Sequence, residues 1–373
     1  MTFTPTSDNV VETDEDATIT PSGSSLDGQV TYAANDVTIT NNDTASLSLN
    51  DPTVAEDGGT VTFTITSSNP SEDDVTETDD TSNDSATAGS DYTAISGATA
   101  TITGDSSTTT TTVVVTIAND QRVEGDEDFD LDLSSAQFDG ATDATRATIG
   151  DATGTATITD NDTVEFAFTN ATSDVDEDDV TRNVEVTATL TVDGTGDPGF
   201  DRTISVDVVD LGTGTADEGT DSNDDYEYPA ADTLTFSSVD GNGTSFMKDA
   251  VLTIREDIVD DDAETINLQI QNLVDGSTTQ ASIDGANRDH TVTINDDDDA
   301  TVTVDAPADG AADDFRAERD GADLVIFNGT TEVSRRPFAG VTTLTFDGAD
   351  GEDDSFTVDP YTDTFSHTII PFC

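Results

Sequence analysis

Apolar and polar residues alternate along much of this chain, and the alternation predicts β-strands. In residues 129–133, one phenylalanine and two leucines alternate with two aspartates. A period of two residues is typical of a half-buried strand. No stretch keeps the 3.6-residue period of an amphipathic helix. We therefore expect an all-β protein of antiparallel sandwiches, with further strands in the runs rich in Val, Ile, Thr, Leu and Phe at 61–65, 204–208, 324–327 and 344–346.

Two stretches lack this alternation. Residues 71–88 and 212–224 consist mainly of Ser, Thr, Asp and Gly. Low hydrophobicity combined with high charge is typical of disorder, because such a segment buries too little apolar surface to offset the loss of chain entropy. We expect these two segments to be disordered loops and the remainder to fold.

Acidic loops recur beside the predicted strands. The segment 119–128 carries several carboxylates around Gly125 and leads directly into the strand at 129–133, and similar acidic segments lie at 11–16 and 259–266. A second motif, a strand end followed by an acidic cluster, occurs at 38–43, 157–162 and 293–298. Its last residues are separated by 162 − 43 = 119 and 298 − 162 = 136 positions. Repeats at such spacing indicate a tandem array.

The repeats divide the chain into four parts. Residues 44–162 and 163–299 are two complete units, and no glycine-, serine- or proline-rich linker separates them. Residues 1–43 hold only the C-terminal half of a truncated unit, so we expect the chain to be a fragment of, or an internal start within, a longer array. Residues 300–373 form an acidic, β-rich C-terminal segment that could begin another β domain.

The composition narrows the range of partners. The 81 Asp and Glu residues against 11 Lys and Arg give a formal charge of −70, which disfavours nucleic acid and anionic membranes and favours cations. Lys248 is the one lysine, and the surplus of carboxylates fits a halophilic protein exposed to high salt or a secreted acidic adhesin; both can hold. Cys373 is the one cysteine, so no internal disulfide forms, and no apolar run resembles a membrane span or a signal peptide.

The acidic segments suggest a metal site. Within 44–162, four of them are separated by strand-length stretches, and in a sandwich the loops of several strands meet at one end. Carboxylates gathered there repel one another unless a cation lies between them. Ca²⁺ accepts six to eight oxygen ligands in flexible geometry and fits this arrangement better than Mg²⁺ does. Zinc prefers His or Cys, and the only histidines, His290 and His367, are isolated.

Four ordered motifs resemble a known family. The segments 54–59 (VAEDGG), 88–92 (AGSDY), 123–127 (VEGDE) and 159–162 (TDND) are similar to those of a Calx-β domain, the module of the sodium/calcium exchanger regulatory loop, some integrin subunits and many large bacterial surface proteins. The resemblance extends over roughly 1–299. It implies a seven-stranded immunoglobulin-like sandwich that binds calcium at one tip, and a secreted or cell-surface location.

The resemblance also implies the calcium ligands. In the first unit they are Glu56, Asp91, Asp120, Glu124, Asp126 or Glu127, Asp160 and Asp162. In the second unit they come from Glu177, Asp225, Asp257, Asp260, Asp261, Glu264, Asp296, Asp297 and Asp298; one extra residue in its middle loop leaves open whether Asp260 or Asp261 replaces Glu124. Asn119, Gln121 and Asn161 depart from the fully acidic pattern, so we expect fewer or weaker sites in the first unit.

These features favour a non-catalytic calcium-binding module of a large extracellular protein, in which Ca²⁺ at the domain tips stiffens a rod for adhesion or cell communication. The ligands of such a module are calcium ions and a cell-surface protein or polysaccharide. One alternative is a calcium-sensing regulatory module, and another is a carbohydrate- or protein-binding spacer attached to an enzyme. We expect no enzyme activity here, because the chain has no Gly-x-Ser-x-Gly elbow, no phosphate-binding loop and no tryptophan.

Overall fold

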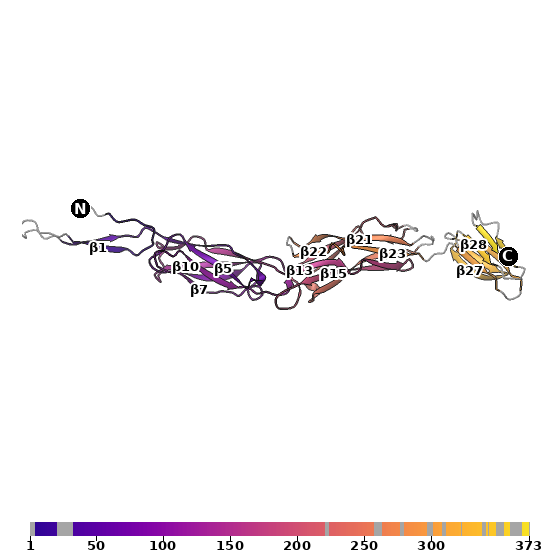
Figure 1. The fold of residues 1–373 in the computed structure, drawn as a ribbon, viewed down its shortest axis with the longest axis horizontal. Coiled ribbons are helices and arrows are strands. Elements are labelled where there is room, and N and C mark those ends of the chain that lie inside the picture. The colour runs from indigo at the N-terminus through magenta and orange to yellow at the C-terminus, as the bar shows by residue number, and fades with distance from the viewer. Residues whose placement is uncertain are drawn as a thin grey trace, which may run out of the picture.

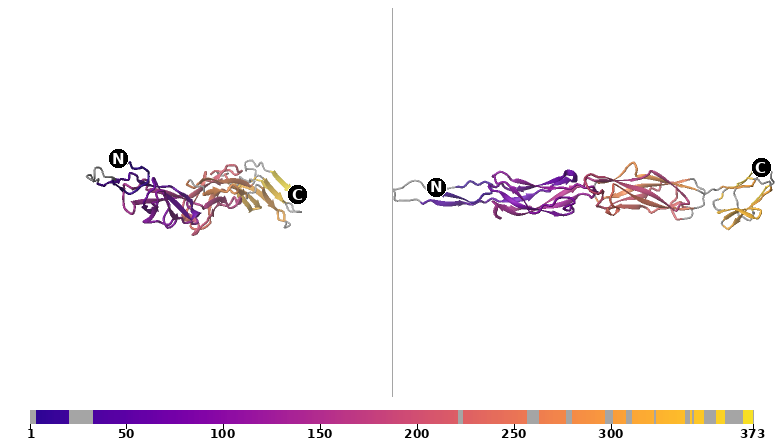
Figure 2. Two further views of the ribbon diagram at one scale, coloured as in Figure 1. Left: turned by 60° about the vertical axis from the view of Figure 1, so that its left-hand side comes forward. Right: turned by 90° about the horizontal axis from the view of Figure 1, so that it is seen from below.

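The structure is a computed structural model that describes residues 4–20, 33–220, 224–256, 263–276, 280–296, 301–307, 311–321, 323–337, 341, 343–347, 354–358 and 368–372. Apart from two three-residue 3-10 turns, the regular structure of these residues is β. This confirms the predicted all-β class. Three separate hydrophobic cores lie end to end along one long axis, preceded by a hairpin (Figures 1 and 2). Within the described residues, no helix reaches the length and apolarity that crossing a bilayer requires.

The first sandwich packs a five-stranded sheet, in the order β4-β12-β10-β6-β7, against a four-stranded sheet, in the order β11-β3-β5-β8. Its core centres on aromatic rings that both sheets and one loop contribute. Its elements are β3 (Ala45–Leu49), β4 (Thr53–Ala55), η1 (Glu56–Gly58), β5 (Thr60–Ser67), β6 (Val75–Asn83), β7 (Ala98–Ile102), β8 (Thr110–Thr116), β10 (Glu127–Phe138), β11 (Ala147–Ile149) and β12 (Thr153–Thr159).

The second sandwich begins at once, because its first strand starts at Thr163, directly after Asp162. Two five-stranded sheets, β18-β20-β15-β13-β22 and β14-β23-β21-β17-β19, enclose its core. Its elements are β13 (Thr163–Phe168), β14 (Thr172–Asp176), β15 (Thr181–Thr191), β17 (Ile204–Asp210), β18 (Tyr226–Glu227), β19 (Asp232–Phe236), η2 (Ser238–Asp240), β20 (Ser245–Ile254), β21 (Glu264–Val274), β22 (Ala281–Ile283) and β23 (Asp289–Asn295).

Smaller elements flank and join the two sandwiches. An N-terminal hairpin pairs β1 (Glu15–Ile19) with β2 (Asn35–Ile39). A two-stranded parallel ladder between β9 (Arg122–Val123) and β16 (Gly199–Phe200) connects the first sandwich to the second. A third, smaller body holds the sheets β24-β28-β30 and β27-β26-β25-β29, with β24 (Thr301–Asp305), β25 (Asp314–Asp320), β26 (Asp323–Asn328), β27 (Thr331–Pro337), β28 (Thr343–Asp347), β29 (Ser355–Val358) and β30 (Thr368–Phe372).

The strands predicted from alternation are confirmed. Residues 129–133 lie in β10, where Phe129, Leu131 and Leu133 are buried and the aspartates between them are half-buried. The runs at 61–65, 204–208, 324–327 and 344–346 lie in β5, β17, β26 and β28. An alternating strand thus anchors the acidic loop 119–126 to the core.

The expectation of disorder at 71–88 is wrong. Residues 75–83 form β6, which pairs with both β10 and β7. Its inward positions alternate correctly, but two of them are Glu77 and Asp79, each 1% exposed. A hydrophobicity pattern cannot reveal a strand whose core face carries carboxyl groups.

Candidate metal centre at one end of the first sandwich

The register of the sheet gathers several acidic residues at one end of the first sandwich. In the antiparallel pair of β10 and β12, Glu127 lies opposite Ile158, one position before the end of β12. The parallel pair of β12 and β4 sets Ala55 beside Thr159. The residues that follow these strands, Glu56 and Asp160, therefore reach the same end as Glu127.

These residues surround a small cavity. Its lining consists of Glu56, Asp91, Glu124, Gly125, Glu127, Ile158 and Asp160. Carboxylate oxygens of Asp91, Glu124 and Glu127 lie within 4.8 Å of one another, although these residues come from two separate loops. Three converging carboxylates with few positive neighbours have the chemistry of a hard-cation site.

Backbone hydrogen bonds hold the loops in place around the cavity. Glu56 Oε1 accepts the backbone N–H of Asp120 at 2.7 Å. Asp160 Oδ2 accepts the N–H groups of Glu124 and Gly125 at 2.9 and 3.0 Å. Gly125 has φ +104°, a conformation that glycine adopts without strain. Two of the predicted ligands thus also fix the shape of the loop that carries Glu124 and Glu127.

Without a cation, the cluster is too crowded to be fully ionised. Burial, followed by the charges of Asp120 and Glu127, raises the pKa of Glu124 to about 9. Burial and then the charge of Asp91 raise the pKa of Glu127 to about 8, and burial raises the pKa of Glu56 to about 7. At neutral pH Glu124 and Glu127 hold protons and Glu56 is about half protonated, and a cation would displace these protons.

Three other predicted ligands of the first unit are placed differently. Asp120 lies beside the cluster, and its Oδ1 accepts the N–H of Arg122 at 2.8 Å. Asp126 is exposed and does not line the cavity, so of Asp126 and Glu127 it is Glu127 that reaches the cluster. Asp162 is 0% exposed, and its Oδ1 accepts the N–H of Asp193 from the second sandwich at 2.8 Å.

The second unit repeats part of this arrangement at its far end. Asp225 Oδ2 accepts the N–H of Asp217 at 2.5 Å, as Asp91 Oδ2 accepts the N–H of Thr87 at 2.6 Å. Glu177 is buried, and its N–H donates to the carbonyl of Asn295 at 3.1 Å. Glu264 and Asp296 are half-buried at the ends of β21 and β23. The remaining predicted ligands, Asp257, Asp260, Asp261, Asp297 and Asp298, lie outside the described residues.

One carboxylate beside the cluster was absent from the predicted set. Asp201, on the second sandwich, forms an ion pair with Arg122 at 2.6 Å, two positions before Glu124. Its segment matches none of the four motifs, so motif matching could not identify it. The available signal was Val123, an isolated apolar residue within an acidic loop, because such a residue indicates packing against a neighbouring surface.

The family model described as Calx-beta domain matches residues 39–162. No curated protein sequence matches the chain. Among solved structures, the chain is similar to CBD12 from CALX1.2, with 16% identity and a TM-score of 0.29 over 67% of this chain and 99% of that one. It is also similar to the calcium binding domain CBD12 of CALX1.1, with 16% identity and a TM-score of 0.30 over 66% and 99%.

Proposed function

Residues 39–162 form a domain of the Calx-β family, and from this premise we propose that the acidic end of the first sandwich binds Ca²⁺. The observation that carries the proposal is the convergence of Asp91, Glu124 and Glu127 within 4.8 Å of one another, inside the matched domain. The second sandwich, at Glu177, Asp225, Glu264 and Asp296, is proposed to hold a corresponding site.

The ligand set favours calcium over other metals. All the charged side chains that line the cavity are carboxylates. His290 is buried in the second sandwich, where its ring is hydrogen-bonded to the carbonyl of Asn170 at 2.6 Å. Magnesium requires near-ideal octahedral geometry, whereas calcium tolerates ligands from several loops at uneven angles. The ligands span separate elements, so a bound ion would tie η1, the turn before Tyr92 and β10 together.

Calcium is expected to raise the thermal midpoint of the full chain. A cation that binds only the folded state stabilises it by mass action, by about 2.7 kcal/mol at a concentration one hundred times the dissociation constant. Melting curves in millimolar CaCl₂ and in excess chelator, with MgCl₂ at the same ionic strength as the control, measure this effect. Identical midpoints in all three solutions would contradict the proposal.

We further propose that calcium stiffens the chain as a rod. Asp160 and Asp162 immediately precede β13, so the proposed ligands are also the connection between the two sandwiches. Gln280 of the second sandwich donates through Nε2 to the carbonyl of Asp160 at 3.1 Å, so the second sandwich also contacts this connection. The division into units 44–162 and 163–299, and a place in a secreted or cell-surface protein with an adhesion partner, belong to this proposal.

Small-angle scattering on the full chain tests the rod. Calcium is expected to lengthen the maximum interatomic distance relative to the sample in chelator, because the ligand loops no longer fluctuate. An equal maximum dimension in both solutions would count against stiffening while leaving calcium binding intact. A stiffened, non-catalytic spacer differs in this respect from a sensor, which would change the angle between its units.

A further inference from the structure

The loop that carries Glu124 enters the fold of the second sandwich. β9 of the first sandwich pairs in parallel with β16 of the second. The N–H of Gly199 donates to the carbonyl of Gln121 at 3.1 Å, and the N–H of Asp201 donates to the carbonyl of Val123 at 3.2 Å. Val123 is 0% exposed and belongs to the core of the second sandwich. The backbone register of this ladder therefore fixes Asp201 beside Glu124, the residue after Val123.

The side chain of Asp201 lies against the loop that carries Glu124. Its Oδ1 is 2.6 Å from Nη2 of Arg122, two positions before Glu124. The Asp201 charge also acts on Asp120 and Glu127. Arg122 is itself held by the second sandwich, through Nη2 to the carbonyl of Phe200 at 2.8 Å. A carboxylate of the second sandwich thus lies beside the cation cluster of the first, paired with Arg122, although it is not among the residues that line the cavity.

We propose that Asp201 is a further ligand of the cation at the first sandwich, so that this site is complete only when the second sandwich is docked on it. The inference rests on the proposed calcium function. It deepens that function by adding a ligand from outside the matched family domain, and it makes calcium affinity depend on the contact between the units.

Buried oxygens at the same junction lack donors. Asp162 is 0% exposed, and its Oδ2 has no hydrogen-bond partner among the described residues. Oxygens of Asn161 and Gln280 are buried there in the same way. Buried carboxylate and amide oxygens normally have hydrogen-bond partners, so these three oxygens are consistent with a cation close to the junction.

The same junction recurs at the N-terminal end of the first sandwich. Val11 is 0% exposed in the first core; its N–H donates to the carbonyl of Pro70, and the N–H of Glu72 donates to the carbonyl of Val11, both at 2.9 Å. Glu72 therefore occupies the position of Asp201, and its charge acts on Glu12, the residue after Val11. A carboxylate at the same register position in both junctions indicates that this arrangement recurs along the array.

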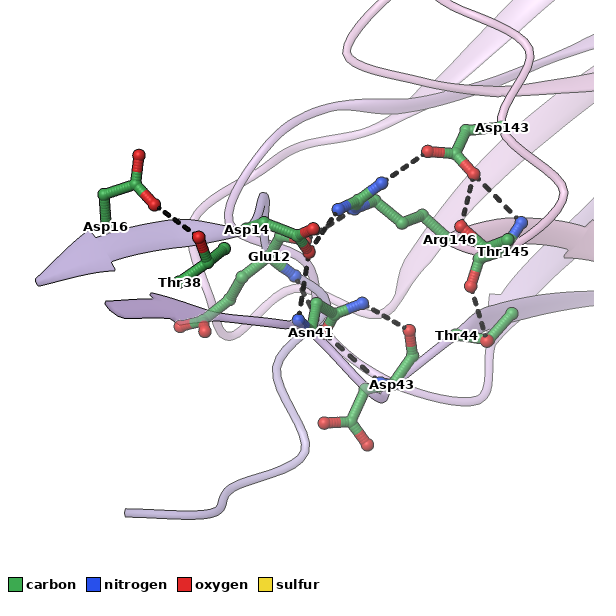
Figure 3. A network of polar contacts seen from close by, with 10 residues as sticks. All are labelled: Glu12, Asp14, Asp16, Thr38, Asn41, Asp43, Thr44, Asp143, Thr145 and Arg146. Atoms are coloured by element: carbon green, nitrogen blue, oxygen red, sulfur yellow. Dashed lines mark hydrogen bonds and ion pairs between the residues drawn. The ribbon is translucent and has the colours of Figure 1, made fainter. Parts of the chain in front are cut away.

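The backbone of the N-terminal junction matches that of the central one in another respect. The N–H groups of Glu12 and Asp43 approach Oδ1 of Asn41 at 3.4 and 3.2 Å (Figure 3), as those of Glu124 and Asp162 approach the carboxylate of Asp160. Arg146 of the first sandwich donates through Nε to the carbonyl of Glu12 at 2.8 Å and pairs with Asp14. Asn41 has one charge fewer than Asp160, so the central junction is the better place for the test.

The test is a calcium titration of the full chain by calorimetry. The Glu124→Gln variant shows which binding event belongs to the first sandwich, because that event is the one it weakens. Asp201→Asn is expected to weaken that event about tenfold, because a charged ligand is lost. Asp197→Asn is the matched control: it removes the same charge from the same segment, but its carboxylate contacts Asn242 instead. Equal affinity for Asp201→Asn and wild type, or an equal loss in Asp197→Asn, would overturn the inference.

A second pair of variants separates docking from charge. A Cβ on Gly194 would lie 2.2 Å from the carbonyl oxygen of Asp120, whereas a Cβ on Gly196 would meet nothing within 4 Å; both glycines have positive φ, +103° and +128°. Gly194→Ala is expected to weaken calcium binding as much as Asp201→Asn, and Gly196→Ala is expected to leave it unchanged. Calcium binding that survives Gly194→Ala overturns the shared site alone, whereas absence of calcium binding in the wild type overturns the proposed function as well.

Discussion

Replacing Phe129 by alanine is expected to destabilise the first sandwich by about 3–5 kcal/mol. Phe129 is 0% exposed, its ring stacks on Tyr92 with centroids 4.1 Å apart, and it meets the edge of Phe63 at 5.9 Å. Truncation removes these contacts and leaves a cavity at the centre of the core. The loss is expected to appear in chemical denaturation as a lower midpoint for the transition of the first sandwich.

Phe129 also connects the core to the metal site. Tyr92 directly follows Asp91, and Phe129 lies two residues after Glu127, so the stacked pair fixes the strand ends that present both carboxylates. Phe129→Ala is therefore expected to weaken calcium binding as well as folding. Val114→Ala on β8, where the side chain is 54% exposed, is the control and is expected to change stability by less than about 0.5 kcal/mol. Similar losses for the two variants would contradict this account of the core.

The metal-free protein is expected to lose stability as the pH rises from 5.5 to 8.5. Burial and then the charge of Asp79 raise the pKa of Glu77 to about 8, and burial raises the pKa of Asp79 to about 6. The carboxyl groups of Glu56, Glu124, Glu127 and Asp162 have raised pKa values for the same main reason. Between the ordinary carboxyl pKa near 4 and these values, the folded state binds more protons than the unfolded state, so the free energy of unfolding falls with rising pH.

Adding calcium and substituting Glu77 separate the pH-dependent loss of stability at the metal site from the loss at β6. Calcium is expected to reverse the loss that arises at Glu124 and Glu127, because it replaces their protons. The loss at Glu77 remains, since neither of its carboxylate oxygens has a hydrogen-bond partner among the described residues and it lies on β6 away from the cavity lining. Glu77→Gln is expected to gain on the order of 4 kcal/mol over wild type at pH 8.5 and about 1 kcal/mol at pH 5.5.

Thermal melting at the two pH values, in chelator and in calcium, measures these differences. Asp151→Asn, at an exposed position of the first sandwich, is the control for a change of charge without burial. A midpoint that rises with pH in chelator, or a Glu77→Gln variant that tracks wild type at both pH values, would refute the assignment of protons to the buried carboxyl groups.

Sequence patterns predicted the parts of the fold that depend on local periodicity. The alternation at 129–133 predicted β10 because its inward residues are apolar, whereas β6 escaped prediction because Glu77 and Asp79 occupy inward positions. The motifs also placed Glu56, Asp91, Glu124, Glu127 and Asp160 in loops that the structure brings to one cavity. Their roles as ligands remain a prediction.

The position of Asp201 beside the Glu124 loop could not be predicted from the sequence, where Val123 indicates only that this loop packs against some neighbouring surface. It depends on the pairing of β9 with β16, which joins residues almost eighty positions apart and brings Val123 into the core of the second sandwich. Neither strand has more than two residues, so neither has a detectable period of its own. Only the register of the ladder, set by the burial of Val123 in the second core, places Asp201 beside Glu124.

The most direct test of the central claim is the position of the ion itself. Crystals of the full chain grown in calcium, measured for the anomalous signal of the metal, are predicted to show a peak between Asp91, Glu124 and Glu127. Carboxylate oxygens should lie at about 2.3–2.6 Å from the peak, the distances that calcium takes in proteins. Crystals grown in calcium that show no anomalous peak in this cluster, or that show calcium only elsewhere on the acidic surface, would contradict the account.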